Sequence, residues 1–326
     1  MPDVVTLTNL DFEYELAGRD LPPQLSRRWR HVLRALPEAR DAHCLDPGEP
    51  EPFTGRLLPW GVTPRVVALA PHQEFPEPAV VREVNDKRFS HRLEQRLGVA
   101  LPYAREVTAL EELETAVREC PHDWVLKHPF GVSGRERALG KAGQLSDSGR
   151  GWARRQLQSW SLVFEPWVEP RNDFSLHFDV GRDGEVHYVG HCQLLADPSG
   201  VYRGNLVEPG ATPPEAAREC AHEVAAELAR QGYWGPVGID AFSGTLGGQP
   251  VLRPLVEVNA RYSFGRLTLA LRDWLPEGWG VLWSHPRDPV TGHPPWNGEA
   301  IAGTYGLPPV LDPDGSSGTA LTVTGR

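Results

Sequence analysis

Short apolar runs and one amphipathic stretch alternate along the first part of the chain. Residues 4–9 (VVTLTN) and 65–70 (RVVALA) have the composition of strands, and the apolar spacing over 22–36 predicts a helix between them. A connection rich in Pro and Gly, DPGEPEPFTGRLLPWGVTP, separates this helix from the second strand. We therefore expect a small α/β lobe over residues 1–85. No glycine fingerprint follows either strand, so we do not expect this lobe to bind a dinucleotide by itself.

The pattern after residue 85 predicts longer helices and strands. Residues 86–97 have helical periodicity with Asp86 as the expected cap, and a second helix over 108–120 carries Thr108 and Glu111 in capping-box spacing. Further along, we predict strands over 123–127, 161–165, 173–180 and 185–193, a helix over 213–231, and a hairpin formed by GPVGIDAF and PVLRPLVEVNA. These elements predict two more lobes, over residues 86–165 and 166–326.

Composition and charge exclude several classes of partner. The formal net charge of −10 disfavours a nucleic-acid partner, because sequence-independent binding needs a basic face. The four cysteines form no CxxC pair, which indicates free thiols in a reducing compartment rather than a zinc knuckle. No apolar window approaches the ~18 residues of a membrane span, and the segment MPDVVTLTNLDFEYEL lacks the basic segment and apolar run that are typical of a secretory leader. We expect a cytoplasmic protein without a membrane partner.

Lysine is rare in this chain. Of 33 lysines and arginines, only Lys87, Lys127 and Lys141 are lysines. A drift this strong towards arginine leaves lysine mainly where a compact ammonium group cannot be exchanged for a planar guanidinium. Lys87, in the first turn of a predicted helix, and Lys127, at the end of the apolar run WVLK, are therefore candidates for a specific role.

A loop of small residues follows Lys127. Gly131, Ser133 and Gly134 can bring consecutive backbone N–H groups within reach of phosphate oxygens, because little side-chain volume blocks the approach. The P-loop pattern GxxxxGK[ST] and the nucleophile elbow GxSxG both fail here on spacing. A phosphate cradle and an ordinary hairpin turn both remain open as interpretations of this loop.

Three oxygen-bearing side chains stand at the ends of predicted strands. Asp240 follows the run PVGI, and Glu257 and Asn259 lie two residues apart, so these two point to the same face. If the two strands pair as a hairpin, Asp240 joins them there. Carboxylate and amide oxygens suit Mg²⁺ together with nucleotide phosphates. The alternative is that these side chains are simply solvated.

The segment Glu165-Pro166-Trp167-Val168 joins two β-rich regions. An adenine ring needs an apolar slot with a backbone donor and acceptor at its edge, and an extended hinge can supply them. Pro166 has no N–H group, so Val168 is the expected donor. Read alone, the segment is also consistent with a kinked strand.

The order of these signals along residues 80–270 resembles the ATP-grasp superfamily. The segments that carry the resemblance are LKHPFGVSGRER, GPVGIDAF and LVEVNARYSFG, and the last is similar to the EvNaR segment of carboxylate-activating members. The resemblance implies a mixed α+β and α/β fold, in which the small N-terminal lobe precedes a two-lobed ATP-grasp unit that holds a nucleotide between two β-sheets. His128 departs from the Lys-Pro pair of many members, and we expect it to be a packing or solvent-facing residue.

The resemblance also implies a role for each matching residue. Lys87 and Lys127 would contact the ATP phosphates under a mobile loop of Gly131, Ser133 and Gly134, with Arg203 as a further phosphate contact. Glu165 and Val168 would meet the adenine edge, and Asp173, or Glu169 instead, would bind the ribose. Asp240, Glu257 and Asn259 would hold one or two Mg²⁺ or Mn²⁺ ions, and Arg261 would act with Lys127 in catalysis by stabilising an acyl phosphate or its tetrahedral adduct.

The activity that the resemblance implies is an ATP-dependent ligation. A small carboxylate would be activated as an acyl phosphate and joined to an amine, with release of ADP and phosphate. Two alternatives stay open, namely a small-molecule kinase with the same ATP site and a nucleotide-binding regulator without turnover. The resemblance allows a homodimer, and the sequence does not decide the oligomeric state.

Overall fold

The computed structural model describes residues 4–19, 24–27, 29–131, 136–196, 200–284 and 320–324. Within these ranges the strands are β1 Val4–Leu7, β2 His43–Cys44, β3 Arg56–Pro59, β4 Arg105–Val107, β5 Trp124–Lys127, β6 Arg137–Gly140, β7 Leu162–Pro166, β8 Glu169–Val180, β9 Val186–Ala196, β10 Tyr202–Val207, β11 Gly235–Leu246, β12 Gln249–Asn259, β13 Gly280–Ser284 and β14 Ala320–Thr324. The α-helices are α1 Phe12–Leu16, α2 Gln24–Arg27, α3 Pro64–Leu69, α4 Pro78–Val84, α5 Lys87–Arg96, α6 Leu110–Glu119, α7 Asp147–Gln156, α8 Glu215–Arg230 and α9 Phe264–Arg272, and short 3-10 helices span Val32–Ala35 and Pro37–Ala39.

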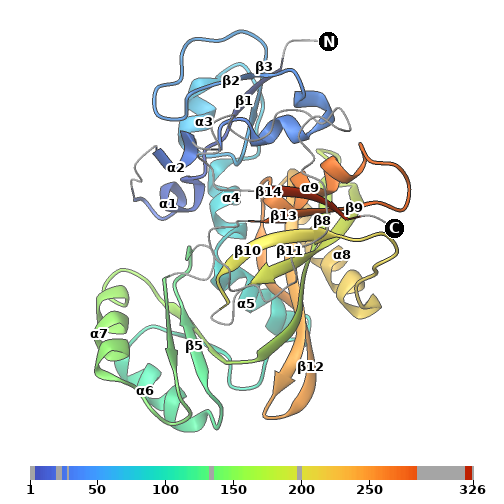
Figure 1. Cartoon of the computed structure of the whole chain (residues 1–326). Coiled ribbons are helices and arrows are strands. Elements are labelled where there is room, and N and C mark those ends of the chain that lie inside the picture. Colours follow the sequence, from blue (N-terminus) through green and yellow to red (C-terminus); the bar gives the residue numbers. More distant parts are fainter. Residues whose placement is uncertain are drawn as a thin grey trace.

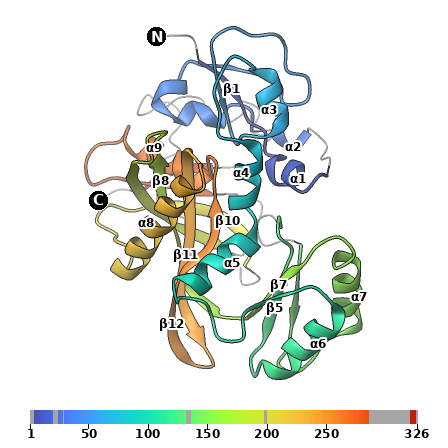
Figure 2. The same ribbon diagram turned by 180° about the vertical axis from the view of Figure 1, so that it is seen from behind.

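The strands form three separate sheets (Figure 1). A parallel sheet of order β2-β1-β3 lies in the N-terminal part of the chain, coloured blue. A four-stranded antiparallel sheet has the order β4-β7-β5-β6, and a seven-stranded antiparallel sheet has the order β12-β11-β8-β9-β10-β13-β14. Seen from behind, α4 and α5 run from the first sheet towards the other two (Figure 2).

Two predictions for the N-terminal part are wrong. Residues 65–69 are not a strand but belong to α3, and Ala70 follows the helix. Pro64 suits the first position of a helix, where no N–H donor is needed, and the Thr63 hydroxyl accepts the Val66 N–H at 3.4 Å. The second strand is instead β3, inside the Pro- and Gly-rich connection. The single helix expected over 22–36 is replaced by α2 and the 3-10 turn Val32–Ala35, whose buried apolar residues produced the helical spacing.

The four-stranded sheet is packed against α6 and α7. Its core includes Trp124, Leu126, Leu162 and Phe164, all of which are buried. The helix predicted over 108–120 is present as α6, but its cap differs from the prediction: the first helical residue is Leu110, and Glu112 rather than Glu111 accepts the Thr108 N–H at 2.7 Å. The residue that accepts from Thr108 lies one position later in the sequence than the capping-box spacing predicted.

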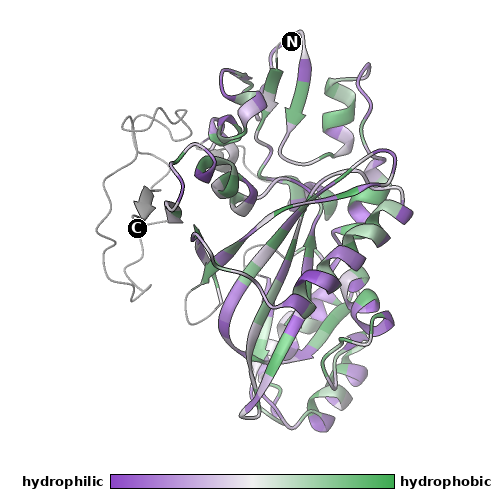
Figure 3. Cartoon of the chain, turned by 90° about the vertical axis from the view of Figure 1, so that its right-hand side faces the viewer, coloured by the Kyte–Doolittle hydropathy of each residue, from purple (hydrophilic) through white to green (hydrophobic). Residues whose placement is uncertain are grey.

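The seven-stranded sheet contains the predicted hairpin of β11 and β12, which turns at Gly247 and Gly248, both with positive φ. The helix α8 packs against β12 and β8, while α9 packs against β9, β10 and β13. The sequence did not predict β10, β13 or α9. Figure 3 shows that the strands of this sheet carry both hydrophobic and hydrophilic stretches. The hydrophobic stretches supply part of the largest core, and the hydrophilic ones include charged residues of the site.

The predicted helix over 86–97 is confirmed as α5, and the Asp86 carboxylate accepts the Arg88 N–H at 2.8 Å as the expected cap. This helix contacts both β12 and β7, so it lies between the two larger sheets. All four cysteines are free thiols. Among the described residues, no helix combines the length and apolar character that a membrane span needs.

Candidate functional site

A cavity of about 600 Å³ lies between the sheets, with lining residues from all three parts of the chain. With the exception of Glu169, the alternative ribose contact, the described residues that the sequence singled out for a site line it: Lys87, Lys127, Gly131, Glu165, Val168, Asp173, Arg203, Asp240, Glu257, Asn259 and Arg261. Ser133 and Gly134 lie outside the described residues. The cavity therefore brings together side chains that are up to 174 positions apart, although their roles in binding stay a prediction.

The strand register explains how the oxygen ligands meet. Asp240 on β11 is directly opposite Glu257 on β12, and Asn259 lies two residues further along the same face. Asn259 donates through Nδ2 to Asp240 Oδ2 at 3.0 Å. Burial and the charge of Glu257 raise the pKa of Asp240 to about 6. Two carboxylates this close destabilise each other's charge, so a cation between them would be favourable.

Asp240, Glu257 and Asn259 could supply some, but not all, of the ligands that a hard cation such as Mg²⁺ needs. Among the described residues, no group of three His, Cys, Asp or Glu side chains could hold a metal ion by itself. Asp240 and Glu257 supply two carboxylates, and Mg²⁺ commonly binds one or two protein carboxylates together with substrate phosphates and water. The arrangement thus suits Mg²⁺ that arrives with a nucleotide better than a closed protein site.

Lys87 lies beside these oxygens because α5 starts there. Its Nζ donates to Glu257 Oε1 and to the Gly131 carbonyl oxygen, both at 2.7 Å. The Lys87 backbone N–H donates to the Pro129 carbonyl oxygen at 3.1 Å, which ties the helix start to the segment before the glycine loop. Lys87 therefore connects that segment to the Glu257 carboxylate of β12.

Lys127 ends β5 and points into a cluster of buried charges. Its Nζ lies 2.6 Å from Glu165 Oε2, and Arg253 Nη1 donates to the same oxygen at 2.6 Å. Arg253 also donates through Nε to Glu94 Oε1 at 2.9 Å. Burial lowers the pKa of Lys127, whereas for Glu165 the two cations outweigh burial and hold its pKa well below the usual range.

The hinge between the sheets has one backbone donor without a described partner, and its residue, Val168, lines the cavity. Trp167 N–H donates to the Asp123 carbonyl oxygen at 2.6 Å, while the Val168 N–H donates to none of the described residues. The Glu165 side chain is committed to Lys127 and Arg253, so its predicted contact with an adenine edge stays a prediction.

Asp173 and Glu169 were the alternative ribose contacts. Asp173 faces the cavity, and its Oδ1 is buried without a hydrogen-bond partner among the described residues. Burial raises the pKa of this carboxyl to about 6. Glu169 does not line the cavity and accepts from the Thr245 hydroxyl at 3.3 Å. The geometry favours Asp173 as the residue that needs a partner from a ligand.

His128 is buried and packs edge-on against Trp160, with ring centroids 5.2 Å apart. Its Nδ1 accepts the Phe130 N–H at 3.1 Å, and burial lowers its pKa to about 4. His128 is therefore packed rather than solvent-facing, and it also lines the cavity.

The N-terminal part of the chain adds residues that the sequence did not single out. Glu13, Tyr14, Trp29 and Trp60 line the cavity, together with Phe264 at the start of α9. Arg261 Nε donates to Glu13 Oε1 at 2.6 Å, and Nη2 of the same residue donates to Asn259 Oδ1 at 2.9 Å. Arg261 thus joins the first lobe to the oxygen ligands of β12.

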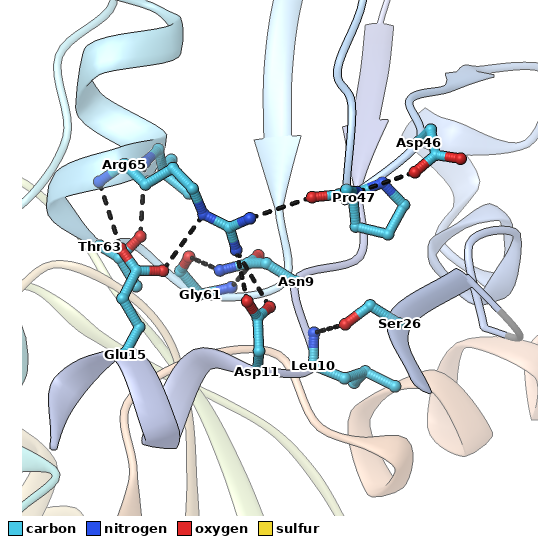
Figure 4. Close-up of polar contacts among 12 residues, drawn as sticks. Asn9, Leu10, Asp11, Glu15, Ser26, Asp46, Pro47, Gly61, Thr63 and Arg65 are labelled. Carbon is cyan, nitrogen blue, oxygen red and sulfur yellow. Dashed lines mark hydrogen bonds and ion pairs between the residues drawn. The ribbon is translucent and has the colours of Figure 1, made fainter. Parts of the chain in front are cut away.

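A polar cluster fixes the helix that carries Glu13 (Figure 4). Arg65 donates through Nη2 to Asp11, the residue before α1, at 2.8 and 3.0 Å, and its Nε lies 3.3 Å from Glu15 Oε2 within α1. These contacts hold the short helix in place. Asn9 and Gly61 exchange two hydrogen bonds, which tie the end of β1 to the residue after Trp60. The cluster is therefore structural and orients two residues of the cavity wall.

No protein-family model matches the sequence. The chain is similar to a biotin carboxylase from Campylobacter jejuni solved with a β,γ-ATP ligand, with a TM-score of 0.53, 14% identity, and coverage of 86% of this chain and 69% of that one. It is also similar to N5-carboxyaminoimidazole synthetase from Staphylococcus aureus in complex with ADP, with a TM-score of 0.52, 10% identity, and coverage of 87% and 82%. The chain has the ATP-grasp fold. The predicted fold is thereby confirmed, and the four- and seven-stranded sheets are the ATP-grasp sheets on either side of the cavity.

A curated relative is more similar in sequence. It is a "[Butirosin acyl-carrier protein]--L-glutamate ligase" from Niallia circulans, 30% identical over 223 residues, which are 63% of this chain and 51% of that protein. The chain therefore spans about half the length of the curated relative that it matches.

Proposed function

We propose that this ATP-grasp protein is an ATP- and Mg²⁺-dependent ligase that activates a small carboxylic acid as an acyl phosphate and joins it to an amine. The observation that carries the proposal is the convergence of Lys87, Lys127, Arg261 and the carboxylates of β11 and β12 on one cavity. The name of the curated relative, a ligase that acts on L-glutamate, supports the same chemistry. A cytoplasmic location is part of the proposal, since all four cysteines are free thiols.

The proposed mechanism follows from charge. A carboxylate is a poor nucleophile towards an anionic triphosphate, so the site must neutralise the γ-phosphoryl group and align the attack. Lys87 and Lys127 would supply compact positive charges, and Asp240, Glu257 and Asn259 would hold Mg²⁺, which when bound neutralises phosphate charge. The Val168 N–H would bind the adenine edge and Asp173 a ribose hydroxyl.

Arg261 would act on the acid substrate. Its guanidinium lies next to Asn259 and can offer two N–H donors to a carboxylate or to the developing oxyanion. Transfer of the γ-phosphoryl group gives an acyl phosphate and ADP, and attack by the amine then displaces phosphate. The cavity walls would keep water from the acyl phosphate in the interval.

A carrier-protein thiol is the second candidate acceptor. The specific observation in its favour is the name of the curated relative, which includes an acyl-carrier protein. Amine and thiol would attack the same acyl phosphate, so the two candidates differ only in the acceptor and share the ATP site.

Phosphorus NMR with Mg·ATP, L-glutamate and other small acids, and pooled amines or a phosphopantetheinyl carrier protein tests the proposal. ADP and free phosphate that appear only with an acid and an acceptor together support a ligase, and the active pool identifies amine or thiol. A new stable phosphoester would indicate a kinase instead, and AMP with pyrophosphate would reject the acyl phosphate.

The site is tested with matched lysine variants. Lys127→Ala should lower ADP release by roughly 10²–10³-fold, the loss typical of removing one preorganised charge donor. Lys141→Ala is the control, because this side chain is 76% exposed and pairs with Asp123 outside the cavity. Equal activity of the two variants would remove Lys127 from the ATP site. Glu257→Gln should raise the Mg²⁺ concentration needed for half-maximal activity and weaken Mg²⁺ binding measured by calorimetry.

A further inference from the structure

The first lobe contributes one carboxylate, Glu13, to the centre of the proposed site. Glu13 lies on α1, and its side chain is only 13% exposed. Its Oε1 accepts from Arg261 Nε at 2.6 Å and contacts Nη2 of the same guanidinium. No described residue donates to the other oxygen, Oε2, and Glu13 lines the cavity. One oxygen is therefore committed to Arg261 and the second is available to a ligand.

The other carboxylates of the cavity have different surroundings. Glu165 is held by two cations, and both oxygens of Glu136 are bound by Arg19. Asp240 and Glu257 are the proposed metal ligands, and Asp173 lies on β8 close to the hinge. Glu13 is thus the lining carboxylate that combines direct contact with Arg261 and an oxygen without a described partner.

Aromatic rings lie close to Arg261, the partner of Glu13. Arg261 Cζ lies 5.7 Å from the Trp60 ring and 5.9 Å from the Phe12 ring, and Phe264 packs on Trp60 with centroids 5.1 Å apart. The rings stabilise the positive charge of Arg261, and the second oxygen of the Glu13 carboxylate attracts a further cationic group. The chemistry of this end of the cavity suits a protonated amine better than a second anion.

We propose that Glu13 binds the ammonium group of the acceptor amine and takes the proton that the amine must lose before it attacks. This inference rests on the proposed ligase function. The ammonium gives one proton to Glu13 Oε2, and the free amine attacks the carbonyl carbon of the acyl phosphate beside Arg261. The C–N bond forms as the C–O bond to phosphate breaks, phosphate leaves, and the second nitrogen proton goes to the departing phosphate.

The position of Glu13 follows from its contacts. Arg65 holds α1 through Asp11 and Glu15, which flank Glu13 in the sequence (Figure 4). Glu15 pairs with Arg65 and does not line the cavity. Glu15→Gln is therefore a control for Glu13→Gln: the same chemical change is made on the same helix, two residues away.

The test compares two acceptors with one acid. Hydroxylamine is largely uncharged at neutral pH and traps acyl phosphates as hydroxamates, so it does not need an ammonium site or a base. An alkylamine, protonated at the same pH, needs both. ADP release is measured with L-glutamate, or whichever acid proves active, and each acceptor in turn for the wild type, Glu13→Gln and Glu15→Gln.

For Glu13→Gln we expect the ratio of amine-dependent to hydroxylamine-dependent ADP release to fall by roughly 10²-fold, the usual contribution of a positioned general base. Glu15→Gln should keep the wild-type ratio. An unchanged ratio in Glu13→Gln overturns the inference whether both rates fall or neither does, because Glu13 would then act only through Arg261 or not at all. Wild-type protein that releases ADP with neither acceptor for any acid would reject the ligase function itself.

Discussion

The buried cluster of Arg253, Glu94, Glu165 and Lys127 gives the sharpest stability prediction. Arg253 lies on β12, and its side chain is 3% exposed; Glu94 and Glu165 are 1% and 3% exposed. The guanidinium donates to Glu94 at 2.9 and 3.1 Å and to Glu165 at 2.6 Å. The perturbation that we consider is Arg253→Met, which keeps most of the side-chain volume and removes the charge.

The magnitude follows from which carboxylate loses its cation. Glu165 keeps Lys127 at 2.6 Å, but Glu94 loses the guanidinium to which it is bound. Removing one partner of a buried ion pair destabilises a protein by about 3–5 kcal/mol, because the remaining charge is buried without compensation. We expect Arg253→Met to lose stability in that range. Adding Glu94→Gln should recover part of the loss, since the uncompensated charge is then gone.

Thermal unfolding followed by tryptophan fluorescence measures the effect, with Arg92→Met as the control. Arg92 is on the same helix as Glu94 and pairs with Glu83 at 2.6 Å, but both side chains are half exposed, so its loss should change stability by about 0–1 kcal/mol. Equal melting temperatures for the two variants would refute the argument that removing a buried charge from this cluster destabilises the protein more than removing an exposed one. The Arg253→Met deficit should also shrink as pH falls. Arg253 is the largest of the charges that hold the folded-state pKa of Glu165 below its ordinary value of 4.5, so this part of the Arg253 contribution is fully present above pH 4.5 and is lost as pH falls from there through the folded-state pKa.

Two further predictions concern packing and protonation. Gly265→Ala should lower stability by roughly 1–3 kcal/mol, because an added Cβ would lie 2.6 Å from His177 Nε2 and 2.7 Å from Cys192 Sγ. Gly151→Ala is the control, because an added Cβ on this residue of α7 would meet only the end of the Arg155 side chain, at 3.6 Å. Equal melting temperatures for the two variants would contradict the predicted clash. Burial lowers the pKa values of His128 and His177 to about 4 and about 3, so the unfolded chain binds more protons and stability should fall as pH drops below 6.5. His128→Gln should flatten that pH dependence in thermal unfolding, and an unchanged slope would show that His128 does not contribute to it.

Local patterns predicted the parts of the fold that local interactions determine. The α5 helix and the β11–β12 hairpin were predicted because their cap, periodicity and glycine turn all lie within the segments themselves. The strand predicted over residues 65–70 was wrong for a physical reason. Val66 and Val67 favour strands by propensity, but Thr63 caps a helix and Pro64 is favoured at its first position, so the segment is helical. β3 was missed because four residues among prolines and glycines give too short a pattern.

The site was predictable where its residues carried a signal in the sequence. Lysines in an arginine-rich chain and oxygen-bearing residues at strand ends were such signals. Arg253 also had a signal in the sequence, which our prediction did not use: an arginine within the apolar strand VLRPLVEV needs buried carboxylate partners. Glu13 carried none, because its contact with Arg261 joins residues 248 positions apart and depends on how the first lobe lies against β12.

Three cations of the cavity are paired with carboxylates in this structure. Lys87 contacts Glu257, Lys127 contacts Glu165, and Arg261 contacts Glu13. An entering triphosphate must therefore compete with these carboxylates for the lysines. If Mg²⁺ binds Glu257 as proposed, the positive charge of the ion replaces that of Lys87 at this carboxylate, and the lysine becomes available to phosphate. Metal and nucleotide should then strengthen each other's binding, and by linkage the factor must be the same in both directions.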